Sequence, residues 1–254
     1  MDLGLQGRVY VVTGASKGLG RASATALAAD GARLVICSRD RDALGKLAQE
    51  LGGSEQIMAV PGDLSDPETA GQLVAAAMGR WDRVDGALIS TGGPKAGPMS
   101  AITDDDWRAS FESVFLGPLR LANAVVASMG EEGGSIAFVL SSSVKQPVEG
   151  LATSNGVRPG LAMAAKTMAD ELGPRNIRVN SLLPGRLDTD RVRELDAAQG
   201  NAEKARRGLE SKIALRRYGQ PEEFGKVAAF VLSPAASYIT GSAIAVDGGM
   251  IRSL

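Results

Sequence analysis

The feature that most constrains the fold is an alternation of short β-branched runs with longer alanine-rich segments. Each run is nearly continuous in apolar residues, which is typical of parallel strands buried on both faces of a sheet. The segments between the runs have the composition of helices, so the chain alternates strand and helix. This order predicts one α/β domain over residues 1–254, built on a doubly wound parallel sheet of about seven strands. The predicted strands are Arg8–Val12, Arg33–Cys37, Gln56–Val60, Gly86–Ile89, Ser135–Leu140, Arg178–Leu182 and Ala243–Val246.

A glycine-rich turn, Thr13–Gly20, follows the first predicted strand and precedes the alanine-rich segment Arg21–Ala29. Glycines at such a turn let the backbone approach a pyrophosphate, and the helix N-terminus supplies free N–H donors and a positive dipole. The position between a strand and a helix predicts a Rossmann-type fold that binds a dinucleotide. The predicted contacts in this turn are Gly14, Ser16, Lys17, Gly18, Leu19 and Gly20.

The end of the second predicted strand indicates which dinucleotide is bound. NAD-binding folds usually carry an acidic residue there, which holds the ribose, but this chain has Ser38 followed by Arg39. A guanidinium can pair bidentately with a 2′-phosphate, and Lys17 adds a second positive charge. The alternative is that both cations are simply solvated. We favour NADP(H) over NAD(H), with Ser38 and Arg39 among its contacts.

Composition excludes several kinds of site. The chain has no histidine and one cysteine, which rules out Ser-His-Asp triads, Cys-His pairs and thiolate or histidine metal centres, so we expect no metal. Cys37 lies in an apolar run and is expected in the core. A net charge of −1 argues against binding to nucleic acids or to anionic membranes. No apolar run approaches a membrane span and no targeting pattern is visible, so the expected location is cytoplasmic.

Three segments carry helix-capping chemistry. Ser65 is followed three residues later by Glu68, which predicts a capping box with Ser65 as the N-cap. Thr103–Asp106 has the same form, so its carboxylates are interpreted as a cap rather than a metal site. Gln220 begins another predicted helix.

The stretch Arg186–Gly219, here called the lid segment, is polar and rich in arginine and carboxylates. It is either one or two solvated helices of mixed charge or a mobile lid over a substrate cleft. We favour a lid-like insertion because the segment follows the carboxyl end of a predicted strand, where such sheets bind ligands.

With these features the chain resembles the short-chain dehydrogenase/reductase family from about Gly7 to Gly249. The matching motifs are the TGxxxGxG turn at Thr13–Gly20, the pair Asp63-Leu64, the run Ile177–Asn180 with Pro184-Gly185, and the tail Tyr238–Gly249. The resemblance implies further cofactor contacts at Asp63, Leu64, Thr91, Gly92, Gly93, Arg158, Pro184, Gly185 and Thr189. It also implies a homotetramer or homodimer, with Phe224–Leu232 and Ala243–Val246 between subunits.

The chain departs from the family at its catalytic residues. The asparagine expected on the fourth long helix falls on Val114, whereas the serine after the fifth strand is kept as Ser141. The Tyr-x-x-x-Lys pair aligns with Ser154 and Arg158. The resemblance therefore implies a divergent member with SxxxR in place of YxxxK.

These replacements change the proton chemistry that the resemblance implies. The family's tyrosine passes a proton to the substrate oxygen, and its lysine lowers the pKa of that phenol and holds the ribose. Arg158 can stabilise an alkoxide or hold the ribose, but it cannot relay a proton because it stays charged. Lys145 is the leading replacement acid if it is desolvated, the alternative being an exposed loop lysine. Tyr218 stays open, Tyr238 is interpreted as structural, and Pro159 predicts that the helix begins or kinks at Arg158.

The sequence thus favours an NADP(H)-dependent oxidoreductase acting on a small carbonyl or alcohol substrate, with Ser141, Ser154, Arg158 and Lys145 as candidate catalytic residues. Two alternatives stay open. One is a catalytically silent NADP-binding sensor or assembly subunit. The other is a dehydratase or epimerase on the same scaffold.

Overall fold

The computed structural model describes residues 2–198 and 200–253, and its centre is one parallel sheet. Seven strands lie in the order β3-β2-β1-β4-β5-β6-β7, and every neighbouring pair is parallel. The predicted doubly wound seven-stranded sheet is confirmed, with each strand displaced by no more than two residues at either end. The strands are β1 (Val9–Thr13), β2 (Arg33–Ser38), β3 (Ile57–Pro61), β4 (Gly86–Ile89), β5 (Gly134–Val139), β6 (Ile177–Pro184) and β7 (Ala243–Val246).

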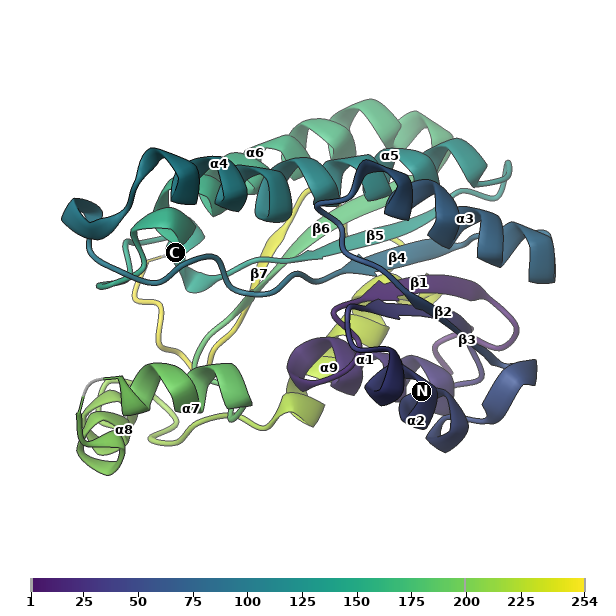
Figure 1. The fold of residues 1–254 in the computed structure, drawn as a ribbon. Coiled ribbons are helices and arrows are strands. Elements are labelled where there is room, and N and C mark those ends of the chain that lie inside the picture. Colours follow the sequence, from purple (N-terminus) through teal and green to yellow (C-terminus); the bar gives the residue numbers. More distant parts are fainter. Residues whose placement is uncertain (1, 199, 254) are drawn as a thin grey trace.

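Helices cover both faces of the sheet (Figure 1). One face carries α1 (Gly18–Ala29), α2 (Arg41–Glu50) and α9 (Pro221–Leu232). The other carries α3 (Pro67–Trp81), α5 (Gly117–Ser128) and α6 (Ala152–Leu172), with α4 (Asp104–Phe111) beside α6. Two separate apolar cores result, which is why the central strands have almost no polar positions.

The lid segment forms α7 (Asp190–Ala197) and α8 (Ala202–Glu210) after the end of β6 (Figure 1). The lid segment therefore contains two helices of mixed charge, which agrees with the interpretation of one or two solvated helices. Residue 199 lies outside the described residues. Whether this segment moves as a lid stays a prediction.

The capping box predicted at Thr103 is confirmed, and the helix predicted to begin at Gln220 does so. The backbone N–H of Gln220 donates to the carboxylate of Glu223 at 2.7 Å. The cap predicted at Ser65 is wrong. At α3 the N-cap is Asp66, which accepts from the backbone N–H of Glu68, and not Ser65. The hydroxyl of Ser65 instead donates to Asp63 at 2.8 Å. A carboxylate is a stronger acceptor for a backbone N–H than a hydroxyl is, which favours Asp66 as the N-cap.

The expectation that α6 begins at Arg158 is wrong, whereas the alternative of a kink there stays a prediction. The helix runs without interruption from Ala152 to Leu172 and contains Pro159. A proline inside a helix costs about 3 kcal/mol through the lost hydrogen bond and the ring clash. Val157, Leu161 and Ala165 are all buried along the inner side of α6, and their packing offsets that cost. Arg158 consequently has a well-defined helical position.

The topological switch point of the sheet lies between β1 and β4, where the strand order reverses. Thr13 joins these strands, because its hydroxyl donates to the carbonyl of Ser90 at 2.8 Å and accepts from the N–H of Ser90 at 2.9 Å. Ligands of such sheets bind in the crevice outside this point. The fold therefore directs attention to the loops after β1, β4, β5 and β6.

Cys37, at the end of β2, is a core residue as predicted. It is 2% exposed, and burial raises the pKa of its thiol to about 12. A thiol in that environment stays protonated and unreactive at neutral pH.

Candidate active site

The glycine turn after β1 is shaped for close backbone approach. Gly14 and Gly18 have φ values of +61° and +58°, which other residues rarely adopt. A Cβ atom on Gly20 would lie 2.3 Å from the carbonyl oxygen of Gly14, so no side chain fits there. Lys17 is the N-cap of α1, and its side chain makes no capping hydrogen bond. The first N–H groups of α1 are therefore open to an anion.

The end of β2 presents an accessible cation beside this turn. The Arg39 side chain is 80% exposed, and its only ion pair among the described residues is with Asp63, at 3.6 Å. Burial raises the pKa of Asp63, but hydrogen bonds from Ser65 and the charge of Arg39 outweigh it, so the pKa is lowered overall. Ser38 bonds to the backbone of Asp40, and Leu64 lies in the core. Arg39 is thus the group at this strand end that is free to meet a ligand.

The loop after β4 and the start of the lid segment face each other near the glycine turn. A Cβ on Gly18 would lie 3.5 Å from the methyl group of Thr189, and one on Gly93 would lie 2.9 Å from Nε of Arg191. Arg191 also donates to the carbonyl of Pro94 at 3.4 Å. These contacts bring the cofactor contacts predicted at Gly93 and Thr189 to the mouth of the same crevice. Thr91, Gly92, Pro184 and Gly185 lie on the same loops and are partly or fully exposed.

The serines after β5 are arranged differently from the sequence-based expectation. The hydroxyls of Ser143 and Ser154 are buried and share a hydrogen bond of 3.1 Å. Ser141 instead accepts from the N–H of Ser143 and caps a short 3₁₀ turn. Ser143, and not the predicted Ser141, is therefore the serine in contact with Ser154. The run of three serines was the available signal, but the sequence could not tell which of them faces α6.

Arg158 lies one turn beyond Ser154 on α6, so the two residues share a face of the helix. Its guanidinium is nearly fully buried and donates through Nη1 to the carbonyl of Val139 at 3.0 Å, beside the end of β5. Burial lowers its pKa to about 10, which still leaves it charged at neutral pH. Val114, in a π-helical turn over Glu112–Leu116, is buried and offers no polar side chain for a water.

No tyrosine serves this site. Of the three in the chain, Tyr10 donates to the carbonyl of Leu232 inside the core. Tyr238 is fully exposed, and the carbonyl of the following residue bonds to Arg178 near the start of β6, at the opposite end from the crevice. Tyr218 is buried and donates to Asp196 at 2.9 Å, and burial followed by this carboxylate raises its pKa. A phenol held in this way is not a proton donor to a substrate.

Lys145 is also unsuited to the role considered for it. Its side chain is exposed, and its backbone N–H bonds to Ser142 within the 3₁₀ turn. The expectation of a desolvated lysine is therefore wrong, and the alternative of an exposed loop lysine holds.

The Tyr218→Phe substitution is expected to leave turnover within about 3-fold of wild type, because the hydroxyl bonds to Asp196 and not to a substrate. A lost general acid would cost about 10²–10⁴-fold in kcat. Steady-state kinetics with any accepted substrate makes the distinction. A drop of two orders of magnitude with unchanged thermal stability would restore Tyr218 as the acid.

The lid segment is held together by its own charges. Arg186 pairs with the buried Asp196 at 2.9 Å, and Arg206 pairs with Asp188 at 3.1 Å while its guanidinium lies 4.5 Å from the centre of the Tyr218 ring. These interactions link α7 and α8 to the segment that directly follows β6. The arginines of this segment are therefore largely engaged internally.

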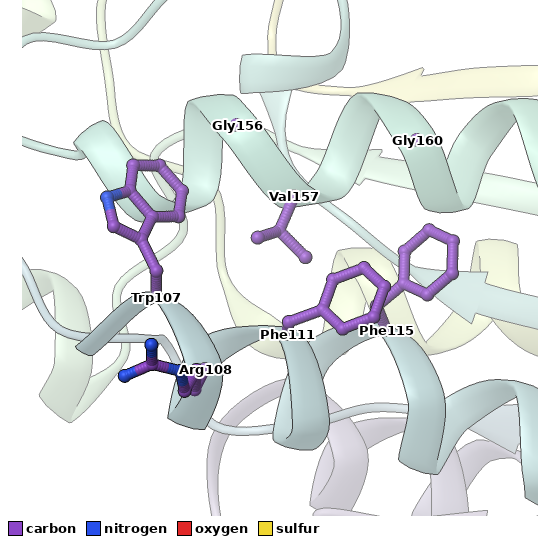
Figure 2. A pocket seen from close by; sticks show the side chains of 7 residues that line it. All are labelled: Trp107, Arg108, Phe111, Phe115, Gly156, Val157 and Gly160. Atoms are coloured by element: carbon purple, nitrogen blue, oxygen red, sulfur yellow. The ribbon is translucent and has the colours of Figure 1, made fainter. Parts of the chain in front are cut away.

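A hollow of about 450 Å³ lies on the other side of α6 (Figure 2). Its wall is largely apolar, and two residues along a helix turn about 200°, so Gly156 faces away from Ser154 and Arg158. The lining residues are Trp107, Arg108, Phe111, Phe115, Gly156, Val157 and Gly160. With no converging polar groups, this hollow is not the candidate active site.

Residues 2–198 and 200–253, which the structure describes, contain no cluster of three or more histidine, cysteine or carboxylate side chains that could hold a metal ion. None of the helices described is both long and apolar enough to cross a membrane.

Comparison with known proteins assigns the scaffold. A family model described as "Enoyl-(Acyl carrier protein) reductase" matches residues 14–251. Human "Dehydrogenase/reductase SDR family member 4" is 33% identical over 251 residues, which cover 96% of this chain and 88% of that protein. The chain belongs to the short-chain dehydrogenase/reductase family.

Two other relatives are similar over their whole length. An uncharacterized oxidoreductase of Methylorubrum extorquens is 34% identical, with 97% of this chain and 98% of that protein covered. The L-sorbose reductase of Gluconobacter frateurii, solved with NADPH and L-sorbose, superposes with a TM-score of 0.94 at 29% identity and full coverage of both chains. This short-chain dehydrogenase/reductase is therefore an oxidoreductase by family, on a scaffold that binds NADPH in a structural neighbour.

Proposed function

We propose that this protein is an NADP(H)-dependent oxidoreductase acting on a carbonyl or alcohol substrate with an atypical acid/base set. The observation that carries the proposal is the open N-terminus of α1 with the exposed Arg39 beside it. The open N-terminus of α1 suits a pyrophosphate, and the guanidinium of Arg39 suits a 2′-phosphate. The NADPH in the sorbose reductase structure supports the same choice.

The residues present fit such a cofactor. The backbone of Gly14–Gly20 would hold the pyrophosphate, Arg39 with Lys17 the 2′-phosphate, and Asp63 with Leu64 the adenine side. Thr91–Gly93, Pro184, Gly185 and Thr189 would line the nicotinamide end. The bound cofactor would supply or accept the hydride.

In this proposal Ser154 and Arg158 replace the family's tyrosine and lysine. The paired hydroxyls of Ser143 and Ser154 would orient the substrate oxygen, and Arg158 would hold positive charge beside it. An aliphatic hydroxyl is a much weaker acid than a phenol, whose pKa is about 10. The proton would therefore come from water, with the serines positioning rather than titrating.

Arg39→Asp should weaken NADPH binding by about 100-fold, because it removes a charge-assisted pair and adds repulsion worth a few kcal/mol. NADH binding should change by no more than about 3-fold. Titration calorimetry with both cofactors measures this. Arg33→Asp is the matched control, since Arg33 is exposed at the opposite end of the same strand. Equal losses for both cofactors, or a loss with Arg33→Asp as well, would contradict the assignment.

A catalytically silent NADP-binding protein is the second candidate, because the structure offers no phenol near Ser154. Tight NADPH binding without turnover across a panel of aldehydes, ketones and oxo acids would favour it. NADPH oxidation that saturates with one of these substrates would reject it.

A further inference from the structure

Two arginines of this chain are more than nine-tenths buried, and their surroundings differ. Arg178 donates to four backbone carbonyls, those of Val231, Leu232, Ser233 and Ile239, at 2.8–3.3 Å. These carbonyls lie at and beyond the end of α9, so Arg178 serves as a C-terminal cap. Its burial is compensated within the fold.

Arg158 is buried to the same degree but has far less compensation. Its only hydrogen bond among the described residues is the one from Nη1 to Val139. No carboxylate of the described chain lies within 4.0 Å of it, and no charged neighbour offsets the lowering of its pKa by burial. A guanidinium has five N–H donors, so most of its hydrogen-bonding capacity is unused. No side-chain nitrogen or oxygen of the described residues is both fully buried and without a partner, so the unpaired nitrogens of Arg158 keep some contact with solvent. They are therefore available to a ligand that enters from solvent.

The position of Arg158 indicates what this ligand is. With Nη1 committed to Val139, the edge formed by Nε and Nη2 remains, and that edge matches the two oxygens of a carboxylate. The buried hydroxyls of Ser143 and Ser154 lie one helical turn away on the same face of α6 and can donate to an oxygen. The group is also next to the end of β5, in the region where this sheet binds ligands.

We propose that Arg158, with Ser143 and Ser154, forms a carboxylate-binding site, so that the substrate is an oxo acid or its hydroxy acid rather than a neutral carbonyl compound. That this ligand is a substrate rests on the proposed function, whereas the binding of a carboxylate at this site does not depend on it. The carboxylate pairs with Arg158, and the oxygen of the adjacent carbonyl group accepts a hydrogen bond from the hydroxyl pair of Ser143 and Ser154.

Oxamate and oxamide test the site directly, because they are similar in shape and size and differ by one negative charge. Calorimetry on the NADPH-loaded protein should give oxamate a dissociation constant at least about 30-fold below that of oxamide. Arg158→Met should remove this preference, and Arg158→Lys should keep part of it. NADPH affinity, measured on both variants, separates this role of Arg158 from a role in holding the cofactor.

Unfolding by denaturant supplies a readout that needs no cofactor. Without ligand, Arg158→Met should be as stable as wild type or more so, because it removes a largely buried charge that has no carboxylate partner and a single hydrogen bond within the fold. The matched control, Arg178→Met, should be clearly less stable. Oxamate should raise the midpoint of wild type and leave that of Arg158→Met unchanged.

The possible failures are distinguishable. If Arg158→Met is destabilised like Arg178→Met and oxamate has no preference over oxamide, Arg158 is a structural residue and the proposal falls. If the variant loses NADPH affinity more than about 10-fold and no carboxylate preference exists, Arg158 holds the cofactor and the proposal also falls. If oxamate binds through Arg158 but NADPH does not bind at all, the proposed function fails and the carboxylate site stands.

Discussion

Gly20→Ala should abolish NADPH binding, with an affinity loss of at least about 100-fold. The added Cβ would lie 2.3 Å from the carbonyl oxygen of Gly14 and 2.8 Å from that of Thr13. Both obstacles are backbone atoms of the turn and cannot rotate away, so the turn must open or α1 must withdraw. Either movement displaces the N–H groups that would hold the pyrophosphate. Titration calorimetry with NADPH measures the loss.

The control for this substitution is Gly71→Ala in α3. Gly71 is exposed and helical, and a Cβ there would meet nothing within 4 Å. Alanine should therefore stabilise the fold by about 0.5–1 kcal/mol while leaving cofactor affinity unchanged. Unaltered NADPH binding by a folded Gly20→Ala variant would show that the cofactor does not use this turn.

Arg178→Met should lower the free energy of unfolding by about 1–3 kcal/mol. The substitution removes a cation that four carbonyls share. The carbonyls of Leu232, Ser233 and Ile239 keep other donors, whereas the buried carbonyl of Val231 loses its only side-chain donor. Methionine fills a similar volume, so the effect isolates the hydrogen bonds from the packing. Denaturant unfolding followed by circular dichroism measures it.

Arg33→Met is the control for Arg178→Met, because Arg33 is exposed at the start of β2. The loss of Arg33 should change the free energy of unfolding by less than about 0.5 kcal/mol. A similar small change for Arg178→Met would mean that water replaces the guanidinium at the end of α9. Local burial argues against this, because Val231 and Leu232 are each 1% exposed.

The strands could be predicted because burial on both faces makes each of them a continuous apolar run. Helix boundaries are harder to predict, because neighbouring residues compete for the same capping position. Ser65 and Asp66 are both good caps and are adjacent in the sequence, and the structure has Asp66 as the N-cap while Ser65 donates to Asp63. Pro159 is a helix breaker by local rules, but the packing of α6 on the sheet is a tertiary effect that no local pattern contains.

The glycine turn was easier to predict from the sequence than the arrangement of the polar side chains beside α6. Such a turn has a fixed place between a strand and a helix, so its position could be named in advance, whereas its contacts with a cofactor stay a prediction. Which of three adjacent serines faces α6 depends on a short 3₁₀ turn, and Ser143 was missed for that reason. The exposure of Lys145 and the pairing of Tyr218 with Asp196 depend on contacts between distant segments, and neither is visible in the sequence.

The aromatic hollow on the outer side of α6 has an optical consequence. The chain has only two tryptophans, and the indole of Trp107 lies against Gly156, midway between Ser154 and Arg158 along the helix. The other, Trp81, ends α3 and can be replaced by phenylalanine. The remaining indole would then be a single fluorophore on the back of the helix that carries the site. Its emission would report ligand-induced movement of α6 in real time, without a label or a coupled assay.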